Sequence, residues 1–245
     1  MSLLEDIEKI KEGDIEVILT LNIDEILPFD PGRLDFPIRL LRNSTPKGFG
    51  ANHNAAFTAS CGHYFCVVNP DIRFSSNPLP MLIDCLNNGR IGVAAPRVRN
   101  TAGEVEDNAR RFPSPLSIAA KIFSRTRDPD YLSGGSDISP DWVAGMFMLI
   151  PFQVFREIGG FDERYFLYYE DVDLCARLRR SGYDIRLCSG VQVVHDARRQ
   201  SHRDWKYRRW HIVSVLRFFT SPVYFSFLWS RWMKKMAASP GSIRR

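Results

Sequence analysis

Four apolar runs of strand length constrain the fold of this chain more than any other feature. They span residues 15–21, 63–68, 91–95 and 144–150. A short run that is apolar throughout is typical of a strand covered on both faces, and strands alternating with helices predict a mostly parallel α/β sheet covered by helices. The expected elements are strands at 15–21, 36–41, 63–68, 91–95, 144–150, 185–187 and 191–194, a hairpin within 105–112, and helices at 3–12, 52–59, 81–87, 152–158 and 171–181.

The composition favours one large folded domain. The chain has 245 residues, of which 44% are hydrophobic, enough to build a full core. Its five cysteines form no CxxC pair, which predicts free thiols in a reducing compartment. The first residues carry acids and no apolar signal core, and no apolar run reaches the roughly 20 residues that cross a bilayer.

The charge is divided unevenly along the chain. From Asp196 onward there are 12 Lys and Arg against 2 Asp and Glu, whereas the preceding residues carry 21 against 26. This division predicts a catalytic domain at 1–200 and a basic, aromatic helical tail at 201–245, and it argues against a nucleic-acid binder. One interpretation of the tail is an interfacial helix on an anionic membrane surface; the alternative is packing on the body or in a dimer.

Three carboxylates, Glu170, Asp171 and Asp173, follow a run of aromatic residues and begin a predicted helix. Buried carboxylates are costly unless they bind a cation, hold a proton or pair with a base. Asp171 suits a general base that deprotonates a hydroxyl group. Glu170 and Asp173 suit either helix capping or the orientation of neighbours, and Asp173 is spaced to pair with Arg177.

Other polar groups follow the predicted strands. Asp71 ends a strand in the sequence Asn69-Pro70-Asp71, where it suits a ligand of a divalent cation, although the tripeptide also fits a simple turn. The loop 43–54 offers glycines and amides ahead of a helix, as in phosphate-binding loops, or it is only a capped connection. His195 ends an apolar run and is either a ligand or an ordinary core or surface histidine.

Taken in order, eight motifs resemble the family 2 inverting glycosyltransferases of the GT-A fold. The closest resemblance is to the bacterial rhamnosyltransferase-like branch, which builds cell-surface polysaccharide, and it covers roughly residues 15–200. The motifs are GFGANHN, VVNPD, the Arg110-Arg111-Phe112-Pro113 segment, AGMFMLI, GGFDE, YYEDVDLCARL, RSGY and VVHD.

The resemblance implies a role for each matching position. Asp171 matches the catalytic base, and Asp71 and His195 match the residues that hold Mg²⁺ or Mn²⁺. The segment 142–146 matches residues along the donor sugar. The implied donor or nucleotide contacts are Asn22, Gly48, Asn52, Asn54, Asn69 and Gly145. The implied acceptor-side residues are Trp142, Asp162, Glu163 and Glu170.

The implied reaction is transfer of rhamnose or a similar sugar, with inversion, from a dTDP- or UDP-linked donor. The acceptor is a saccharide or a lipid-linked saccharide. The expected location is the cytoplasm, with peripheral contact at the inner face of the cytoplasmic membrane.

The chain departs from the family pattern at its start. Residues 15–21 align with the family's second strand, Asn22 takes the usual Asn position, and Leu21 replaces the usual Asp. The first strand, which contacts the nucleobase and ribose, is therefore expected to be absent, leaving residues 3–12 as the end of the first helix. Either the sequence as given starts late in its reading frame, or the chain is a truncated, inactive copy that acts as a binding or scaffold protein. A separate interpretation, a nucleotidyltransferase on a similar sheet, gives no reason for the GGFDE and EDVDL motifs.

Overall fold

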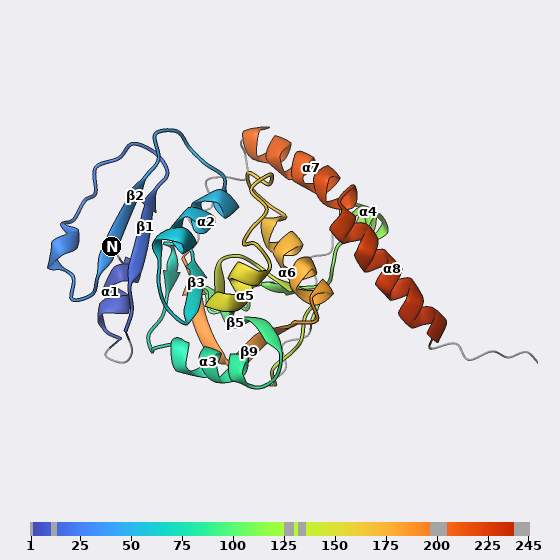
Figure 1. Cartoon of the computed structure of the whole chain (residues 1–245), viewed down its shortest axis with the longest axis horizontal. Helices are drawn as coiled ribbons and strands as arrows, with labels where there is room; N and C mark the ends of the chain where they lie inside the picture. Colours follow the sequence, from blue (N-terminus) through green and yellow to red (C-terminus); the bar gives the residue numbers. More distant parts are fainter. Residues whose placement is uncertain (1, 11–13, 125–129, 132–135, 197–204, 238–245) are drawn as a thin grey trace, which may run out of the picture.

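The computed structural model describes residues 2–10, 14–124, 130–131, 136–196 and 205–237 (Figure 1). The helices are α1 (Ser2–Glu8), α2 (Phe49–Ala59), α3 (Leu79–Asn87), α4 (Pro115–Ser124), α5 (Phe152–Glu157), α6 (Glu170–Arg180), α7 (Trp205–Phe219) and α8 (Pro222–Ala237), with a 3-10 turn at Pro31–Arg33. The strands are β1 (Val17–Leu21), β2 (Ile38–Arg42), β3 (Tyr64–Val68), β4 (Ile72–Arg73), β5 (Ile91–Asn100), β6 (Ala109–Arg110), β7 (Trp142–Val143), β8 (Phe147–Pro151) and β9 (Asp184–His195).

The centre of the molecule is a five-stranded mixed sheet in the order β3-β8-β5-β9-β4. β5 and β9 run parallel, whereas the other neighbouring pairs are antiparallel. β1 and β2 form a separate parallel pair, and no strand of the described chain joins them to the five-stranded sheet. The predicted α/β sheet is confirmed, and its direction is mixed because β8 lies antiparallel between β3 and β5.

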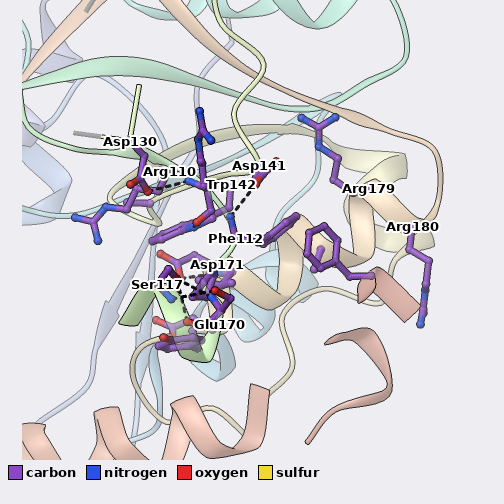
Figure 2. Close-up of a pocket in the computed structure, with 18 of the residues that line it drawn as sticks. Arg110, Phe112, Ser117, Asp130, Asp141, Trp142, Glu170, Asp171, Arg179 and Arg180 are labelled. Carbon is purple, nitrogen blue, oxygen red and sulfur yellow. Dashed lines mark hydrogen bonds between the residues drawn. The ribbon is translucent and has the colours of Figure 1, made fainter. Parts of the chain in front are cut away.

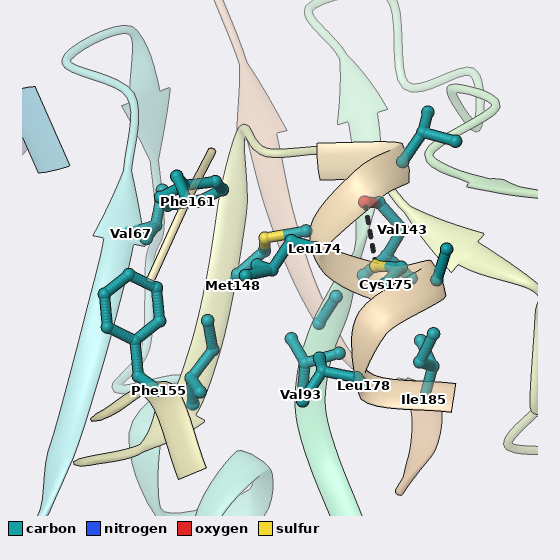
Figure 3. Packing of buried hydrophobic residues seen from close by; sticks show 14 of the residues in the cluster. Val67, Val93, Val143, Met148, Phe155, Phe161, Leu174, Cys175, Leu178 and Ile185 are labelled. Carbon is teal, nitrogen blue, oxygen red and sulfur yellow. Dashed lines mark hydrogen bonds between the residues drawn. The ribbon is translucent and has the colours of Figure 1, made fainter. Parts of the chain in front are cut away.

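Both faces of this sheet are covered. Successive side chains of a strand point to opposite faces, so β8 supplies two cores. Met148 and Ile150 pack with β3, α5 and α6, whereas Phe147 and Leu149 pack on the side of α3. Figure 3 shows the first of these cores between the strands and α6, with Leu174 and Leu178 of that helix labelled. The runs that form β5 and β8 are therefore buried, as expected. β3 alternates buried and half-buried residues, and β1, in the separate pair, is buried only at Leu21, so the expectation of a strand covered on both faces is wrong for residues 15–21.

Several elements differ from the sequence prediction. β4 and β7 were not predicted, and β6, in the segment expected to be part of a hairpin, pairs with the distant β7. The two strands expected at 185–187 and 191–194 are one strand, β9, with a register shift after its pairing of Cys188 with Pro96. The backbone N–H of Ser189 donates to Asp137, and its hydroxyl group donates to the carbonyl of Ser136, so the irregular residue stays hydrogen-bonded. Helix α4 was not predicted, because its proline-rich start is typical of a turn; proline is tolerated at the first helical position.

The prediction of five free thiols is wrong. Cys85 of α3 and Cys188 of β9 form a disulfide, while Cys61, Cys66 and Cys175 are free. The two partners are 103 residues apart in the sequence, and packing of α3 against β9 brings them together. Sequence spacing carries no signal for such a pair.

The tail packs on the body through α7 and α8. Phe218 and Tyr224 are buried, Trp210 stacks on Phe166 with ring centroids 4.5 Å apart, and the Ser214 hydroxyl group donates to the Leu167 carbonyl at 2.9 Å. Figure 1 shows α7 along one side of the body and α8 continuing past it. The predicted boundary between residues 200 and 201 falls outside the described residues.

No single helix of the described chain has the length and apolarity to cross a membrane. One bent pair, Trp205–Phe219 with Pro222–Trp229, meets both criteria together, at an angle of 51°.

A buried ion pair fixes α1 against β4. The Asp6 carboxylate accepts hydrogen bonds from Arg73 Nε at 2.7 Å and Arg73 Nη2 at 3.0 Å, and from the Phe74 backbone N–H at 3.1 Å. These contacts lower the pKa of Asp6 from 3.8 to about 2, and the hydrogen bond from Arg73 has the largest effect; burial opposes the decrease. Since Arg73 lies two residues after Asp71, α1 supports the strand next to a predicted metal ligand.

We predict that Asp6→Asn lowers the melting temperature at neutral pH by about 3 °C. The folded pKa of Asp6 lies below its unfolded value, so the pair stabilises the fold above pH 3.8 and loses this contribution as the pH falls toward about 2. The difference between wild type and variant should therefore shrink over that window in thermal melts. Glu8→Gln, an exposed change on the same helix, is the control, and a pH-independent difference would contradict the assignment.

Candidate functional site

Asp171 lies in the first turn of α6 with its carboxylate held by two backbone N–H groups. Gly145 donates to Oδ2 at 3.0 Å, and Val172 donates to Oδ1 at 2.8 Å. Burial raises the pKa of Asp171, while these hydrogen bonds and the nearby Arg110 oppose the increase. The result is an oriented, partly desolvated carboxylate, which is what a general base requires.

Glu170, the preceding residue, is 5% exposed, and its Oε2 is buried without a hydrogen-bond partner among the described residues. Burial, and then the charge of Asp171, raise the pKa of Glu170 to about 8. Tyr168 and Tyr169, just before it, both have a φ of 70°, a left-handed conformation that costs energy for bulky residues. This pair directly precedes Glu170, whose side chain is buried, and burial favours the protonated form of its carboxyl group.

The third acid of the cluster is structural. Asp173 accepts a hydrogen bond from Arg177 Nε at 2.7 Å, and Arg177 Nη1 donates to the Ile158 carbonyl at 2.7 Å. The predicted pairing of Asp173 with Arg177 is confirmed, and it ties α6 to the end of α5.

Asp171 and Glu170 line a cavity of about 1380 Å³ (Figure 2). Trp142 lies in its wall, with Nε1 donating to the Arg111 carbonyl at 2.9 Å and the Arg110 guanidinium 5.4 Å from its ring centre. Helices α7 and α8 complete the wall, so the tail is part of this cavity. Its basic and tail residues are Arg110, Arg111, Arg179, Arg180, His211, Ser226 and Phe227.

Asp71 and His195, which the resemblance assigns to one metal site, lie together where β4 pairs with β9. β4 pairs with β9 so that Ile72 faces His195, and the neighbouring Asp71 carboxylate then lies 3.3 Å from His195 Nε2. The other ring nitrogen, Nδ1, lies 2.9 Å from Glu106 Oε2. Asp71 first, and then Glu106, raise the pKa of His195 to about 9, although burial opposes the increase.

These side chains fit a divalent cation. Asp71 Oδ1 is buried and has no hydrogen-bond partner within the described residues, so the carboxylate keeps an unused ligand atom. Carboxylate oxygen suits Mg²⁺ or Mn²⁺, and imidazole adds a nitrogen ligand once it releases its proton.

The predicted nucleotide-side residues fall into two groups. Asn22 and Asn52 belong to an amide network, in which Asn43 Nδ2 donates to Asn22 Oδ1 at 2.9 Å and to Asn52 Oδ1 at 2.7 Å. This network shapes the loop before α2, where Gly48 lies so close to Phe166 that a Cβ would meet its carbonyl oxygen at 2.7 Å. The second group lies at the sheet: Asn69 donates from its backbone to Met146, and Gly145 donates to Asp171. Their contact with a nucleotide stays a prediction.

Asn54 and part of the acceptor set lie elsewhere. Asn54 is hydrogen-bonded to both backbone groups of Phe161 and to Glu163, so its amide holds the glycine turn against α2. Asp162 pairs with Arg164 at 2.6 Å. Neither Asp162 nor Glu163 lines the cavity of Asp171, and Glu163 instead lines a smaller cavity of about 400 Å³. The structure therefore brings Trp142 and Glu170, but not this pair, to Asp171.

Two residues of the site had no sequence signal. Glu106 contacts His195, and Asn108 is buried with Nδ2 donating to the Pro96 carbonyl at 2.9 Å. The Asn108 carbonyl accepts the Ala144 N–H at 2.9 Å, next to the Gly145 N–H that holds Asp171. Both residues lie in the connection between β5 and β6, and neither belongs to a sequence motif that would have identified it.

Comparison with known proteins identifies the family. The profile described as "Glycosyl transferase family 2" matches residues 22–151. The chain is 31% identical over 184 residues to rhamnosyltransferase WbbL of Escherichia coli K12, covering 70% of this chain and 69% of that protein. The chain therefore belongs to glycosyl transferase family 2 and is a glycosyltransferase.

A second relative is the N-acetylglucosaminyl-diphospho-decaprenol L-rhamnosyltransferase of Mycobacterium tuberculosis. It is 30% identical over 148 residues, which cover 56% of this chain and 48% of that protein. The chain thus spans about half the length of the mycobacterial relative.

Solved structures confirm the GT-A type of fold. GalNAc-T7 with UDP, GalNAc and Mn²⁺ has a TM-score of 0.57 at 14% identity, covering 77% of this chain and 38% of that one. The mannosyltransferase PcManGT of Pyrobaculum calidifontis, with GDP-Man and Mn²⁺, has a TM-score of 0.55 at 13% identity, covering 98% and 71%.

We predict that Glu170→Gln stabilises the protein more at alkaline than at acidic pH. The folded pKa of Glu170 lies above its unfolded value of 4.5, so wild-type stability is full below pH 4.5 and falls as the pH rises through about 8. Glutamine does not titrate, so the difference in melting temperature should grow by about 3 °C or more across that range.

Exposed Glu163→Gln is the control for this measurement. A difference between Glu170→Gln and wild type that stays constant from pH 5 to pH 8.5, roughly the span of the titration, would refute a buried, protonated Glu170.

Proposed function

We propose that this glycosyltransferase moves rhamnose or a similar sugar, with inversion and with a divalent metal ion, from a nucleoside diphosphate sugar to a saccharide or lipid-linked acceptor. The observation that carries the proposal is the placement of Asp171, whose carboxylate is fixed by Gly145 and Val172 at the wall of a large cavity. A base with this orientation suits the activation of an acceptor hydroxyl group.

The proposed reaction is a single displacement. Asp171 accepts the proton of the acceptor hydroxyl group as its oxygen bonds to the anomeric carbon. The bond between that carbon and the diphosphate oxygen breaks on the opposite face, so the configuration inverts and the nucleoside diphosphate leaves. Trp142 and Glu170 line the same cavity, where they are placed to orient the acceptor.

Mg²⁺ or Mn²⁺ fits the pair formed by Asp71 and His195. Asp71 offers its unpartnered Oδ1 and His195 offers Nε2, 3.3 Å from the other Asp71 oxygen. A bound cation would neutralise the charge of the departing diphosphate. Two structural neighbours, GalNAc-T7 and PcManGT, were solved with Mn²⁺, and this supports the choice.

The names of the relatives support the substrate class. Both relatives are named as rhamnosyltransferases, and the mycobacterial one carries a diphospho-decaprenol acceptor in its name. The four cavity arginines suit a diphosphate on such an acceptor, because guanidinium groups pair well with phosphate oxygens. For the donor we propose a dTDP- or UDP-linked sugar.

The tail suits contact with the inner face of the cytoplasmic membrane, and we propose this peripheral, cytoplasmic location. Trp205 is 72% exposed, Leu216 60% and Ile212 54%, with Arg208 and Arg209 on the same helix. Apolar and basic side chains together favour an anionic bilayer surface. Because α7 also lines the cavity, such contact would bring a lipid-linked acceptor to Asp171.

We predict that Asp171→Asn lowers turnover by about 10²–10⁴-fold, because the acceptor loses its base. Nucleotide affinity should stay nearly unchanged. The assay supplies dTDP-rhamnose with a synthetic N-acetylglucosaminyl-diphospho lipid and follows nucleotide release. Asp84→Asn, an exposed change on α3, is the control. Normal turnover in Asp171→Asn would refute the base, and an inactive wild type across a screen of nucleotide sugars would refute the proposed reaction.

We also predict that Ile212→Glu with Leu216→Glu weakens binding to phosphatidylglycerol vesicles by about tenfold or more. Co-sedimentation measures the effect, with phosphatidylcholine vesicles showing the contribution of charge. Ile26→Glu is the control, because Ile26 is 95% exposed and lies far from α7 in the sequence. Equal binding of all three proteins would contradict the membrane role of α7.

A further inference from the structure

We infer that Glu106 is a positioning residue: it holds His195 so that Nε2 faces Asp71 and completes the cation site. This inference rests on the proposed binding of Mg²⁺ or Mn²⁺ by Asp71 and His195. It adds a residue from a third element, the connection between β5 and β6.

The three side chains form a chain of contacts. Glu106 Oε2 lies 2.9 Å from His195 Nδ1, and His195 Nε2 lies 3.3 Å from Asp71 Oδ2. The side chain of His195 is 15% exposed and that of Glu106 is 20% exposed, so the contact is largely shielded from solvent. The Glu106 carboxylate at Nδ1 therefore orients the imidazole ring so that Nε2 points toward Asp71.

The chemistry of imidazole explains why this matters. A metal-bound histidine uses the lone pair of one nitrogen, and the hydrogen bond of the other nitrogen decides which one is free. With Glu106 as acceptor, Nδ1 keeps its proton, so the proton that a cation would displace is the one on Nε2, beside Asp71. Without Glu106, the ring is free to change both its tautomer and its rotamer.

The backbone around Glu106 is fixed on both sides. Its N–H donates to the Val98 carbonyl at 2.9 Å, and its carbonyl accepts the Asn108 N–H at 2.9 Å. Asn108 also accepts the N–H of Ala144, the neighbour of Gly145. One short segment thus contacts the metal-side histidine and supports the loop that orients the catalytic aspartate.

The test measures Mn²⁺ affinity from the electron paramagnetic resonance signal of free Mn²⁺, with UDP or dTDP present. We expect Glu106→Ala to weaken Mn²⁺ binding by about 10–100-fold, the usual cost of losing such a support. Glu106→Gln keeps an oxygen acceptor for Nδ1 and should restore most of the affinity. Glu104→Ala is the matched control. It removes a carboxylate from the same turn, but the Glu104 carboxylate contacts Asn100 and not His195.

Each outcome decides a separate question. Mn²⁺ affinity in Glu106→Ala equal to that in Glu104→Ala would overturn the role of Glu106 while leaving the cation site intact. A wild type that binds no Mn²⁺ would overturn the metal dependence of the proposed function as well. Thermal melts check folding; if Glu106→Ala unfolds, Glu106→Met, which keeps the length and lacks the acceptor, gives the same comparison with Glu106→Gln.

Discussion

The hydrogen bond from the Gly145 backbone to Asp171 is the contact on which the proposed catalytic site depends. It joins the start of α6 to the turn between β7 and β8, at 3.0 Å. The turn is held in place by the Ala144 N–H, which donates to the Asn108 carbonyl. A Cβ at position 145 would lie 3.3 Å from the Phe49 ring, so α2 also limits this position. Burial raises the pKa of Asp171, and fixed backbone donors are what keep its carboxylate oriented.

The proposed site has two parts: the cavity lined by Asp171, and the pair formed by Asp71 and His195. On the acceptor side, a cavity of about 1380 Å³ combines the acids of α6 with arginines and with two helices of the tail. At the proposed metal site, Asp71 and His195 meet through the pairing of β4 with β9. The β5–β6 connection contacts both halves, because it carries Glu106 toward His195 and Asn108 toward the turn of Gly145. Movement of this connection would therefore disturb both.

Sequence patterns predicted the parts of the site that lie at the ends of regular elements. The acids at the start of α6 and Asp71 at the end of a strand are of this kind, because they lie beside apolar runs whose form is readable. The joint placement of Asp71 and His195 was implied only by the resemblance to the family. The contact of Glu106 with His195 was not predictable, since the residues around Glu106 in the sequence do not show which strand its side chain contacts. The disulfide between Cys85 and Cys188 was missed for the same reason: packing across 103 residues creates it. Helix α4 was missed because its proline-rich start is typical of a turn, although reciprocal hydrogen bonds between Ser114 and Ser117 cap it.

Binding of the nucleotide by this chain is the central claim, and thermal unfolding with UDP or dTDP, with and without Mn²⁺, tests it most directly. A ligand that binds only the folded state raises the melting temperature. We predict that one nucleoside diphosphate together with Mn²⁺ raises it well above the value with either alone, because the diphosphate and the Asp71–His195 pair share the cation. No metal-dependent stabilisation by any nucleoside diphosphate would contradict the catalytic interpretation.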